Sequence, residues 1–341
     1  MAVYTRLTKQ EIINFLADYR IGELIDFNEI IDGIDNSNFI ITTIKNNVKK
    51  KFILTIFEQR IKNEELPYFI NLKVHLASKK IPCPSPISNI NGSIINKIKN
   101  KPAIIVSFLE GRMLKSSVDG CYRDIDIKHC QELGELIGKM HNSTANFVEY
   151  RKNDLSVANF KDLFKKINQK IIQSNLTNII EKQDISINKL QKIIDFLEIN
   201  WSKNGELEVG AVHLDLFPDN VFFNNRKRLV GVIDFYFAAN DILIYDLAIA
   251  VNAWCFDVLK FNYNKFSALI NGYQKYRLIT VAEKKIFGIM NLAASTRFLL
   301  TRLYDKINAD QSSLVKIKDP QEYLFKVNFF YNIVEENIKL L

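Results

Sequence analysis

Hydrophobic positions in the first quarter of the chain change from helical spacing to strand spacing and back again. Thr8 and Glu11 have the spacing of a capping box, and apolar residues then recur on one helical face up to Tyr19. Between residues 27 and 57, β-branched and aromatic runs are separated by short polar turns, which predicts three strands of a small antiparallel sheet. Residues 64–80 are helical in pattern again.

Near residue 110 the hydrophobic pattern changes from mixed helix and strand spacing to mainly helical spacing. Pro82 and the two prolines after it end the second helix. The apolar run 103–109 then predicts a strand that leaves the sheet, and beyond it helical patterns cover residues 127–141, 160–173, 187–201 and most of the chain from 266 onward. We therefore place a hinge after Leu109 and predict two lobes, residues 1–109 and 110–341.

Two short apolar runs in the second lobe predict a hairpin whose open end is polar. Residues 221–223 and 229–233 flank the polar segment 224–228, which suits the tip of the hairpin. Asn220 stands immediately before the first strand and Asp234 immediately after the second. Because the two strands would be antiparallel, both side chains belong to the same end of the hairpin, where they could share a cation.

The spacing of polar residues around this hairpin is typical of a phosphotransfer site. Asp215 precedes Asn220 by five positions. In kinase catalytic loops an acid accepts the hydroxyl proton, an Asn five positions later holds a metal, and a later Asp holds magnesium. A single Asp in a loop usually only caps a turn, so the prediction depends on all three residues together. We predict Asp215 as the catalytic base and Asn220 and Asp234 as ligands of Mg²⁺.

A nucleotide that brings the phosphoryl group would be bound by the first lobe. The turn at residues 32–38 could cradle phosphates through its backbone amides, although an ordinary hairpin turn is the simpler interpretation of that segment alone. The backbone near the hinge could read the edge of adenine. The predicted ATP-binding residues are Gly33, Asn36, Ser37, Asn38, Ser107, Phe108 and Leu109.

Composition excludes several other classes of protein. The 341 residues are 48% hydrophobic and 25% charged, as expected of a globular protein with more than one core. The net charge of +8 comes from Lys dispersed among Asn and Ile rather than from an Arg-rich stripe, so we predict no nucleic-acid partner. No apolar run approaches the ~20 residues of a membrane span, and the N-terminus is unlike a secretory signal, so we predict no membrane partner and a cytoplasmic location.

Several further segments resemble one group of enzymes. The chain is similar to the aminoglycoside-phosphotransferase and choline-kinase branch of the kinase-like enzymes, and within it to the homoserine kinases. The resemblance covers nearly the whole chain and is carried by residues 1–5, 33–38, 52–58, 65–67, 81–84, 213–223, 233–237, 245–249, 252–256 and 297–302. Segments 252–256 (Asn-Ala-Trp-Cys-Phe) and 297–302 (Arg-Phe-Leu-Leu-Thr-Arg) look specific to the homoserine kinases.

The resemblance implies a fold and a reaction. The fold is α+β, a two-lobed protein-kinase-like architecture with a small antiparallel-sheet N-lobe that binds the nucleotide and a larger, mainly helical C-lobe that binds the substrate. The reaction is ATP-dependent phosphorylation of the side-chain hydroxyl of L-homoserine to O-phospho-L-homoserine, a step toward threonine. One position departs from the wider kinase pattern, because Thr55 stands where the third strand usually carries a Lys, as the homoserine kinases also have it. Lys51, Arg60 or stronger reliance on Mg²⁺ could then supply the missing charge, and Glu65 could be the helix acid that usually pairs with that Lys.

A zwitterionic acceptor requires one cation and one anion near Asp215. The forked guanidinium of Arg suits a carboxylate best, and Arg297 and Arg302 are the candidates, although each could equally pair with a nearby acid such as Asp305. The remaining candidates are Asp241 or Asp305 for the ammonium, Asp246 for hydrogen bonds to the backbone beneath the site, and Tyr236 and Trp254 for lining the pocket or packing in the core.

Two alternatives stay open from the residues alone. The first is a kinase for another small alcohol, such as an aminoglycoside, choline or methylthioribose. An aminoglycoside pocket should be acidic and a choline pocket aromatic, and segment 297–302 fits neither well. The second alternative is an inactive kinase-like binding module. Thr55 leaves it open, and the intact Asp215, Asn220 and Asp234 argue against it.

Overall fold

The computed structural model describes residues 4–31, 36–58, 62–116, 122–173, 187–201, 207–308 and 318–341, which fall into two compact units. The first unit comprises residues 1–111 and 230–236, and the second comprises residues 112–229 and 237–341. The first boundary lies two residues beyond the predicted one, and the return of segment 230–236 to the first unit was not foreseen. The assignment of nucleotide binding to residues 1–109 and of catalysis to residues 110–341 stays a prediction.

The first unit is built on an antiparallel sheet with the strand order β1-β2-β3-β6-β4, in which β5 also pairs with β6. Its elements are α1 (Lys9–Leu16), β1 (Glu23–Ile30), β2 (Asn36–Lys45), β3 (Val48–Phe57), α2 (Leu66–Ser78), β4 (Pro86–Ile87), β5 (Asn96–Ile98) and β6 (Lys101–Ser107). Thr8 and Glu11 form the predicted capping box at the start of α1. The three strands and two helices predicted for this region are therefore confirmed.

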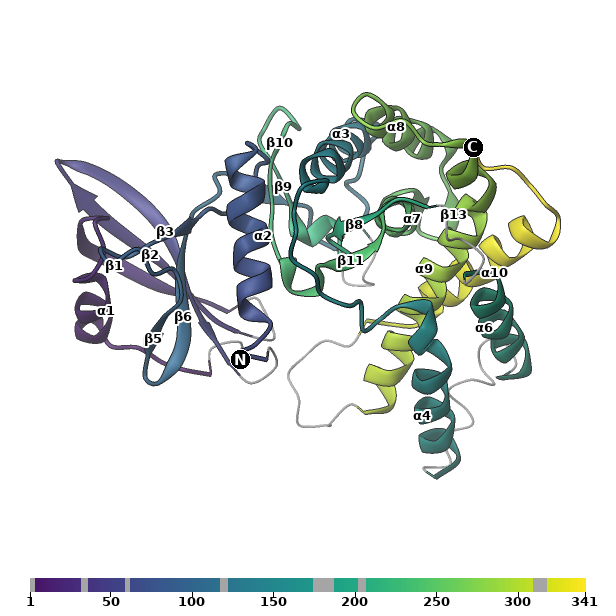
Figure 1. Ribbon diagram of the computed structural model, residues 1–341, viewed down its shortest axis with the longest axis horizontal. Coiled ribbons are helices and arrows are strands. Elements are labelled where there is room, and N and C mark those ends of the chain that lie inside the picture. The colour runs from purple at the N-terminus through teal and green to yellow at the C-terminus, as the bar shows by residue number, and fades with distance from the viewer. Residues whose placement is uncertain are drawn as a thin grey trace. The chain divides into compact units, whose positions relative to one another are not determined.

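The sheet of the first unit is buried on both faces, which its alternating side chains explain. Phe52, Leu54 and Ile56 of β3 point into a cluster with α1, whereas Ile53 and Phe57 pack in a second cluster with α2. The two helices accordingly cover opposite faces of the sheet (Figure 1). Segment 230–236, which contains most of β10 (Leu229–Val232), is joined to this unit by a hydrogen bond from Val232 N to Pro82 O of 3.0 Å.

The second unit is mainly helical, with short strands that carry its loops. Its helices are α3 (Ile127–Thr144), α4 (Phe160–Gln173), α6 (Ile187–Trp201), α7 (Leu243–Trp254), α8 (Tyr263–Gln274), α9 (Val281–Ile307) and α10 (Gln321–Glu335). Its strands are β7 (Arg112–Met113), β8 (Val209–Val212), β9 (Val221–Phe223), β11 (Ala239–Ile242), β12 (Phe256–Asp257) and β13 (Lys260–Phe261). Three short 3₁₀ turns are η1 (Val157–Asn159), η2 (Pro218–Asn220) and η3 (Phe235–Phe237), the last at the junction with the first unit. The predicted α+β class is confirmed.

Helices α3 and α8 pack side by side at unusually close range (Figure 1). A Cβ atom at Gly134 of α3 would lie 2.0 Å from the backbone oxygen of Leu269, and one at Gly138 would lie 2.7 Å from that of Tyr273. Only glycine allows the two backbones to approach this closely. The close approach brings the end of α3, where His141 lies, against Tyr273 of α8.

Candidate active site

The loop between β8 and β9 carries the predicted base and holds it by a local contact. Asn220 Nδ2 donates to the backbone oxygen of Asp215 at 2.8 Å and to its Oδ2 at 2.9 Å. The amide oxygen of Asn220 takes no part in these two bonds. The structure therefore brings Asp215 and Asn220 together, as their spacing predicted, within the second unit.

The backbone of this loop is strained at the residue before the base. Leu214 has a φ of 63°, a left-handed conformation that costs roughly 1–2 kcal/mol for a residue other than glycine. Its amide donates to Asp246 Oδ1 at 2.8 Å, and its carbonyl accepts from Arg297 Nη1 at 2.7 Å. Such strain persists only where surrounding contacts fix it, and it is concentrated at functional sites.

Asp246 anchors the loop from below, which confirms the role predicted for it. This residue is wholly buried, and its carboxylate accepts from the amides of His213 (3.0 Å) and Leu214 (2.8 Å). Burial alone would raise the pKa of Asp246, but His141, His213 and the loop amides together hold it below its ordinary value. The carboxylate therefore stays ionised and keeps its backbone hydrogen bonds at neutral pH.

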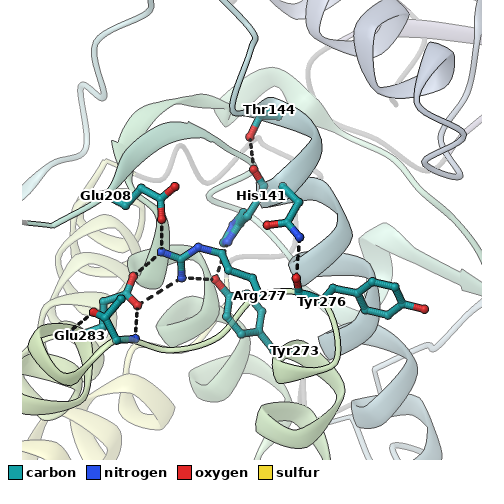
Figure 2. Close-up of polar contacts among 9 residues, drawn as sticks. His141, Thr144, Glu208, Tyr273, Tyr276, Arg277 and Glu283 are labelled. Carbon is teal, nitrogen blue, oxygen red and sulfur yellow. Dashed lines mark hydrogen bonds and ion pairs between the residues drawn. The ribbon is translucent and has the colours of Figure 1, made fainter.

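His141 connects Asp246 to a second layer of polar residues. Figure 2 shows this layer, in which His141, Tyr273 and Arg277 contact one another. His141 Nε2 lies 3.5 Å from Asp246 Oδ2, and its Nδ1 lies 2.9 Å from the Tyr273 hydroxyl. The Tyr273 hydroxyl accepts a hydrogen bond from Arg277 Nη1 at 2.8 Å, so it can donate its own proton to His141 Nδ1. We therefore assign the imidazole proton of His141 to Nε2, which faces Asp246. Arg277 is in turn paired with Glu283 at 2.7 Å and with Glu208 at 2.6 Å. The chain of contacts links α3, α8 and α9 to the catalytic loop.

Sequence reasoning found only part of this second layer. His141 ends the segment 127–141 that was predicted to be helical, and its side chain is buried. Its partner Tyr273 lies 132 residues away, a separation at which no local spacing gives a signal. The close-packed glycines of α3 are the one sequence feature that could have indicated the contact.

Trp254, a predicted pocket residue, supports the loop from the core. Its side chain is completely buried, and its Nε1 donates to the backbone oxygen of Leu216 at 2.7 Å. The structure thus favours packing in the core, one of the two roles predicted for Trp254, while contact of Trp254 with a substrate stays a prediction.

The environment of Asp215 adjusts its basicity. Burial raises the pKa of Asp215 above its ordinary value, while Arg297 and His213 act to lower it. A carboxylate accepts a proton more effectively when its pKa is closer to the working pH. The site is therefore electrostatically suited to a general base.

Asp234, the second predicted metal ligand, belongs to the first unit. It has a φ of 66°, so it too lies in the left-handed region. Lys73 of α2 is only 6% exposed, and burial lowers the pKa of its ammonium to about 8, against the opposite influence of Cys83 and Asp234. Sequence reasoning missed Lys73, because one lysine on an apolar helix resembles a solvent-facing position.

Tyr236, predicted to line the acceptor pocket, packs among first-unit side chains. Its ring meets Phe57 and Phe69 edge-on, at centroid distances of 5.7 and 5.8 Å, and Lys73 Nζ lies 5.7 Å from its centre. Tyr236 is therefore a partly buried residue that packs against the core of the first unit. A contact between Tyr236 and the substrate stays a prediction.

The predicted phosphate-binding turn is only partly described. Gly33 lies outside the described residues, whereas Asn36, Ser37 and Asn38 begin β2. Ser37 Oγ donates to Glu58 at 2.6 Å and accepts from the amide of Thr5 at 2.9 Å. Asn36 Oδ1 accepts from the Glu58 amide at 3.4 Å, and Asn38 Oδ1 accepts from Thr55 Oγ1 at 2.7 Å. These side chains join β2 to its neighbours, and their contact with a nucleotide stays a prediction.

The predicted adenine-binding residues lie at the end of β6 and just beyond it. The backbone amide of Ser107 donates to the Ser85 carbonyl at 2.9 Å, and the Ser85 amide donates to Ser107 Oγ at 2.9 Å. The amide of Ser107 is therefore already hydrogen-bonded. Lys51, one candidate for the missing third-strand charge, lies 5.4 Å from the ring centre of Phe108, and Leu109 packs against Gly231. Arg60, the other candidate, is outside the described residues. Nucleotide binding by Ser107, Phe108 and Leu109 stays a prediction.

The two predicted substrate arginines have different surroundings. Arg297 is 2% exposed and lines a cavity, with its Nη1 bonded to the Leu214 carbonyl. Arg302 donates from Nη1 to Glu322 Oε2 and to the Asp319 carbonyl, both at 2.8 Å, so its acid partner is Glu322. Asp241, a candidate for the ammonium, already accepts from Asn153 Nδ2 at 2.6 Å.

The predicted metal ligands have the right chemistry for magnesium. Mg²⁺ prefers oxygen ligands, and both a carboxylate such as that of Asp234 and the amide oxygen of Asn220 provide them. Because Asn220 Nδ2 is committed to Asp215, its Oδ1 is the atom left to meet a cation. Asn220 belongs to the second unit and Asp234 to the first, and their assignment to one ion stays a prediction.

Comparison with known proteins places the chain among enzymes of this kind. A match to the phosphotransferase enzyme family covers residues 26–279, which is most of the chain. The chain belongs to that family. Full-length relatives include the homoserine kinase of Rhodopseudomonas palustris (strain BisB5), 39% identical over 98% of this chain and 95% of the relative. The homoserine kinase of Bartonella henselae is 40% identical over 98% of each chain. The resemblance to homoserine kinases is confirmed.

Solved structures of other phosphotransferases share the fold of the chain. An amicoumacin kinase in complex with AMP-PNP and Ca²⁺ superposes with a TM-score of 0.64 at 14% identity, over 98% of this chain and 95% of that one. The ethanolamine kinase of Plasmodium vivax gives a TM-score of 0.61 at 14% identity, over 92% and 84%. At such low identity these likenesses concern the fold alone, and they confirm the predicted kinase-like architecture.

Proposed function

We propose that the protein transfers the γ-phosphoryl group of ATP to the side-chain hydroxyl of L-homoserine and releases O-phospho-L-homoserine and ADP, a step toward threonine. The observation that carries the proposal is the 39–40% identity to homoserine kinases over essentially the whole length of both chains. The intact catalytic loop at Asp215 and Asn220 supports an active enzyme rather than a kinase-like binding module.

The residues of the second unit account for the chemistry on the acceptor side. The hydroxyl oxygen of the acceptor forms a bond to the γ-phosphorus of ATP while the bond from that phosphorus to the ADP oxygen breaks. Asp215 takes the proton that the hydroxyl group loses. Asn220 keeps the carboxylate of Asp215 in place, and Asp246 holds the backbone on which that carboxylate stands. When bound, Mg²⁺ offsets the negative charge of the phosphate oxygens, and Asn220 and Asp234 are the residues that would hold it. Most of the catalysis is then positioning and electrostatics.

Release of ADP over a small panel of acceptors tests this function. The purified protein is incubated with ATP, MgCl₂ and one acceptor at a time: L-homoserine, choline, methylthioribose or an aminoglycoside. We expect ADP release with L-homoserine and a phosphorylated amino acid as its product. A response to another alcohol alone would identify a different kinase of the family, and no release with any acceptor would support the binding module.

The sequence-based expectations about location and partners stay predictions. Among the described helices, none is both long and apolar enough to cross a lipid bilayer. A cytoplasmic location and the absence of nucleic-acid and membrane partners have no further support.

A further inference from the structure

A cavity of about 280 Å³ opens between α4 and α9 in the second unit. The charged residues of its lining are two acids, Asp154 and Asp162, and two bases, Lys166 and Arg297. Thr301 and Leu155 are among its uncharged lining residues. We call it the α4–α9 pocket. A lining with both signs of charge in a small space suits a ligand that is itself a zwitterion.

Arg297 is the buried charged residue of the pocket lining and has unused hydrogen-bonding capacity. It is 2% exposed, and its Nε is buried with no hydrogen-bond partner within the described part of the chain. Leaving a buried charged donor without a partner is unfavourable, and a ligand that accepts a hydrogen bond from it removes that penalty. Its guanidinium carbon lies 4.7 Å from the ring centre of Phe298 and 5.8 Å from that of Phe237, which fixes the plane of the group.

The acids of the pocket are available to a ligand. Asp154 and Asp162 are both exposed, and over the described ranges neither carboxylate forms a hydrogen bond or ion pair. The two candidates that sequence reasoning offered for an ammonium differ from them, since Asp241 is already bonded to Asn153 and neither it nor Asp305 lines the pocket. Sequence reasoning missed Asp154 and Asp162 because they lie in a polar stretch with no motif.

We propose that the α4–α9 pocket binds the α-carboxylate and α-ammonium groups of the acceptor, with Arg297 on the carboxylate and Asp154 and Asp162 on the ammonium. The proposal rests on the proposed function and adds how the amino-acid end of the substrate is recognised. Arg297 also holds the carbonyl of Leu214, the residue before Asp215. The amino-acid end would thus be bound beside the segment that carries the base, so that the hydroxyl end faces Asp215.

Acceptors that lack one charged group test the two halves of the pocket separately. We use L-homoserine, 3-aminopropan-1-ol, which lacks the carboxylate, and 4-hydroxybutanoate, which lacks the ammonium. In Arg297→Gln we expect the ratio of kcat/KM for L-homoserine to that for 3-aminopropan-1-ol to fall roughly 100-fold, because a buried, charge-assisted contact is lost only with the first acceptor. A variant that merely disturbs the catalytic loop would slow both acceptors alike and leave the ratio unchanged.

The acids are tested in the same way and against a matched control. In Asp154→Asn and Asp162→Asn we expect the ratio of kcat/KM for L-homoserine to that for 4-hydroxybutanoate to fall roughly 5-fold each, as for partly exposed ion pairs. The control is Asp195→Asn, an acid on α6 whose carboxylate is paired with Lys161 at 3.0 Å and which does not line the pocket. Its ratio should stay at the wild-type value.

The outcomes separate this inference from the proposed function. If the wild-type protein phosphorylates L-homoserine but neither ratio changes in the pocket variants, the pocket assignment is wrong and the function stands. If the wild-type protein releases no ADP with L-homoserine, the function itself is overturned, and the pocket assignment falls with it. Because Asp154 and Asp162 are exposed, their variants should fold even if Arg297→Gln does not, which circular dichroism checks.

Discussion

Arg297 and Arg302 are both buried on α9, five residues apart, but their hydrogen-bond partners differ. Around Arg302 the charge is satisfied within the protein, by Glu322 and by the Asp319 carbonyl. Around Arg297 the guanidinium bonds to one backbone carbonyl, Leu214 O, and its Nε has no partner in the described residues. A buried charge whose hydrogen-bond partners are internal contributes to folding, whereas a buried donor nitrogen without a partner, beside a cavity, indicates a ligand. The difference teaches that burial alone does not assign a role to a charged residue.

The largest expected effect on stability is for Glu322, the acid that pairs with Arg302. Glu322 is bonded to both Arg302 and Lys326, and although burial alone would raise its pKa, these two cations lower it to about 2. A decrease from 4.5 to about 2 corresponds to about 3 kcal/mol of stability at neutral pH. Glu322→Gln should therefore lower the free energy of unfolding by about 3 kcal/mol at pH 7, measured by urea denaturation.

The pH dependence of that loss follows from its sign. The folded-state pKa of Glu322 lies below the unfolded-state value, so its contribution is fully present above about pH 4.5 and disappears as the pH falls toward 2. The difference in stability between wild type and Glu322→Gln should narrow over that window. A difference that stays constant between pH 7 and pH 3 would show that the contacts of Glu322 act through packing rather than charge.

The next largest effect is expected when Arg297 or Arg302 is replaced by lysine, which should separate a substrate-binding arginine from a structural one. Lysine keeps the charge but loses the forked geometry, so Arg297→Lys should raise the KM for L-homoserine roughly 30-fold, a loss of about 2 kcal/mol, with little change in the KM for ATP. Arg302→Lys should lower the melting temperature instead, because the bonds of Arg302 are internal. A raised homoserine KM in Arg302→Lys would support its sequence-based assignment to the substrate and would remove the contrast between the two regions.

The smallest expected effect extends the comparison to the first unit. Lys73 is buried, and its ammonium has no hydrogen bond or ion pair within the ranges that the structure describes. Lys73→Met should therefore stabilise the fold, by roughly 1–2 kcal/mol at pH 7. Normal folding with lost turnover in this variant would instead assign Lys73 to the nucleotide site.

The charge of Lys73 should destabilise the fold whereas that of Glu322 stabilises it, yet in both cases the stability of the wild type relative to the variant should rise with pH. Burial lowers the pKa of Lys73 from 10.5 to about 8, so between these pH values the unfolded chain binds more protons than the folded one. Wild-type stability should consequently rise with pH across this window relative to Lys73→Met, and the advantage of the variant should shrink. Thermal denaturation of both proteins at pH 7 and pH 9.5 measures this change.

Local patterns predicted much of the fold. The helices expected at residues 160–173 and 187–201 have those bounds in α4 and α6, and the capping box at Thr8 forms as expected. Helical and strand periodicity is a property of neighbouring residues, which a single sequence displays directly. The return of segment 230–236 to the first unit was invisible to such reasoning, because it depends on contacts with Pro82 and Leu109, more than 100 residues away.

The candidate site was predicted where spacing carries the chemistry and missed where it does not. Asp215 and Asn220 lie five residues apart and contact each other, and Asp246 holds the loop as expected. Asp154, Asp162 and Lys73 have no characteristic neighbours in sequence, and the roles proposed for them rest only on the cavity and the burial around them. Spacing alone could also not distinguish Arg297 from Arg302, since their partners come from different loops and helices.

The central claim is that Asp215, on a loop held by Asp246 and Arg297, is the base that takes the proton from the hydroxyl of L-homoserine. The turnover of Asp215→Asn with saturating ATP and L-homoserine tests it most directly. We expect a protein that folds and melts like the wild type, with kcat reduced roughly 100-fold or more. Wild-type kcat in a correctly folded Asp215→Asn protein would contradict the account.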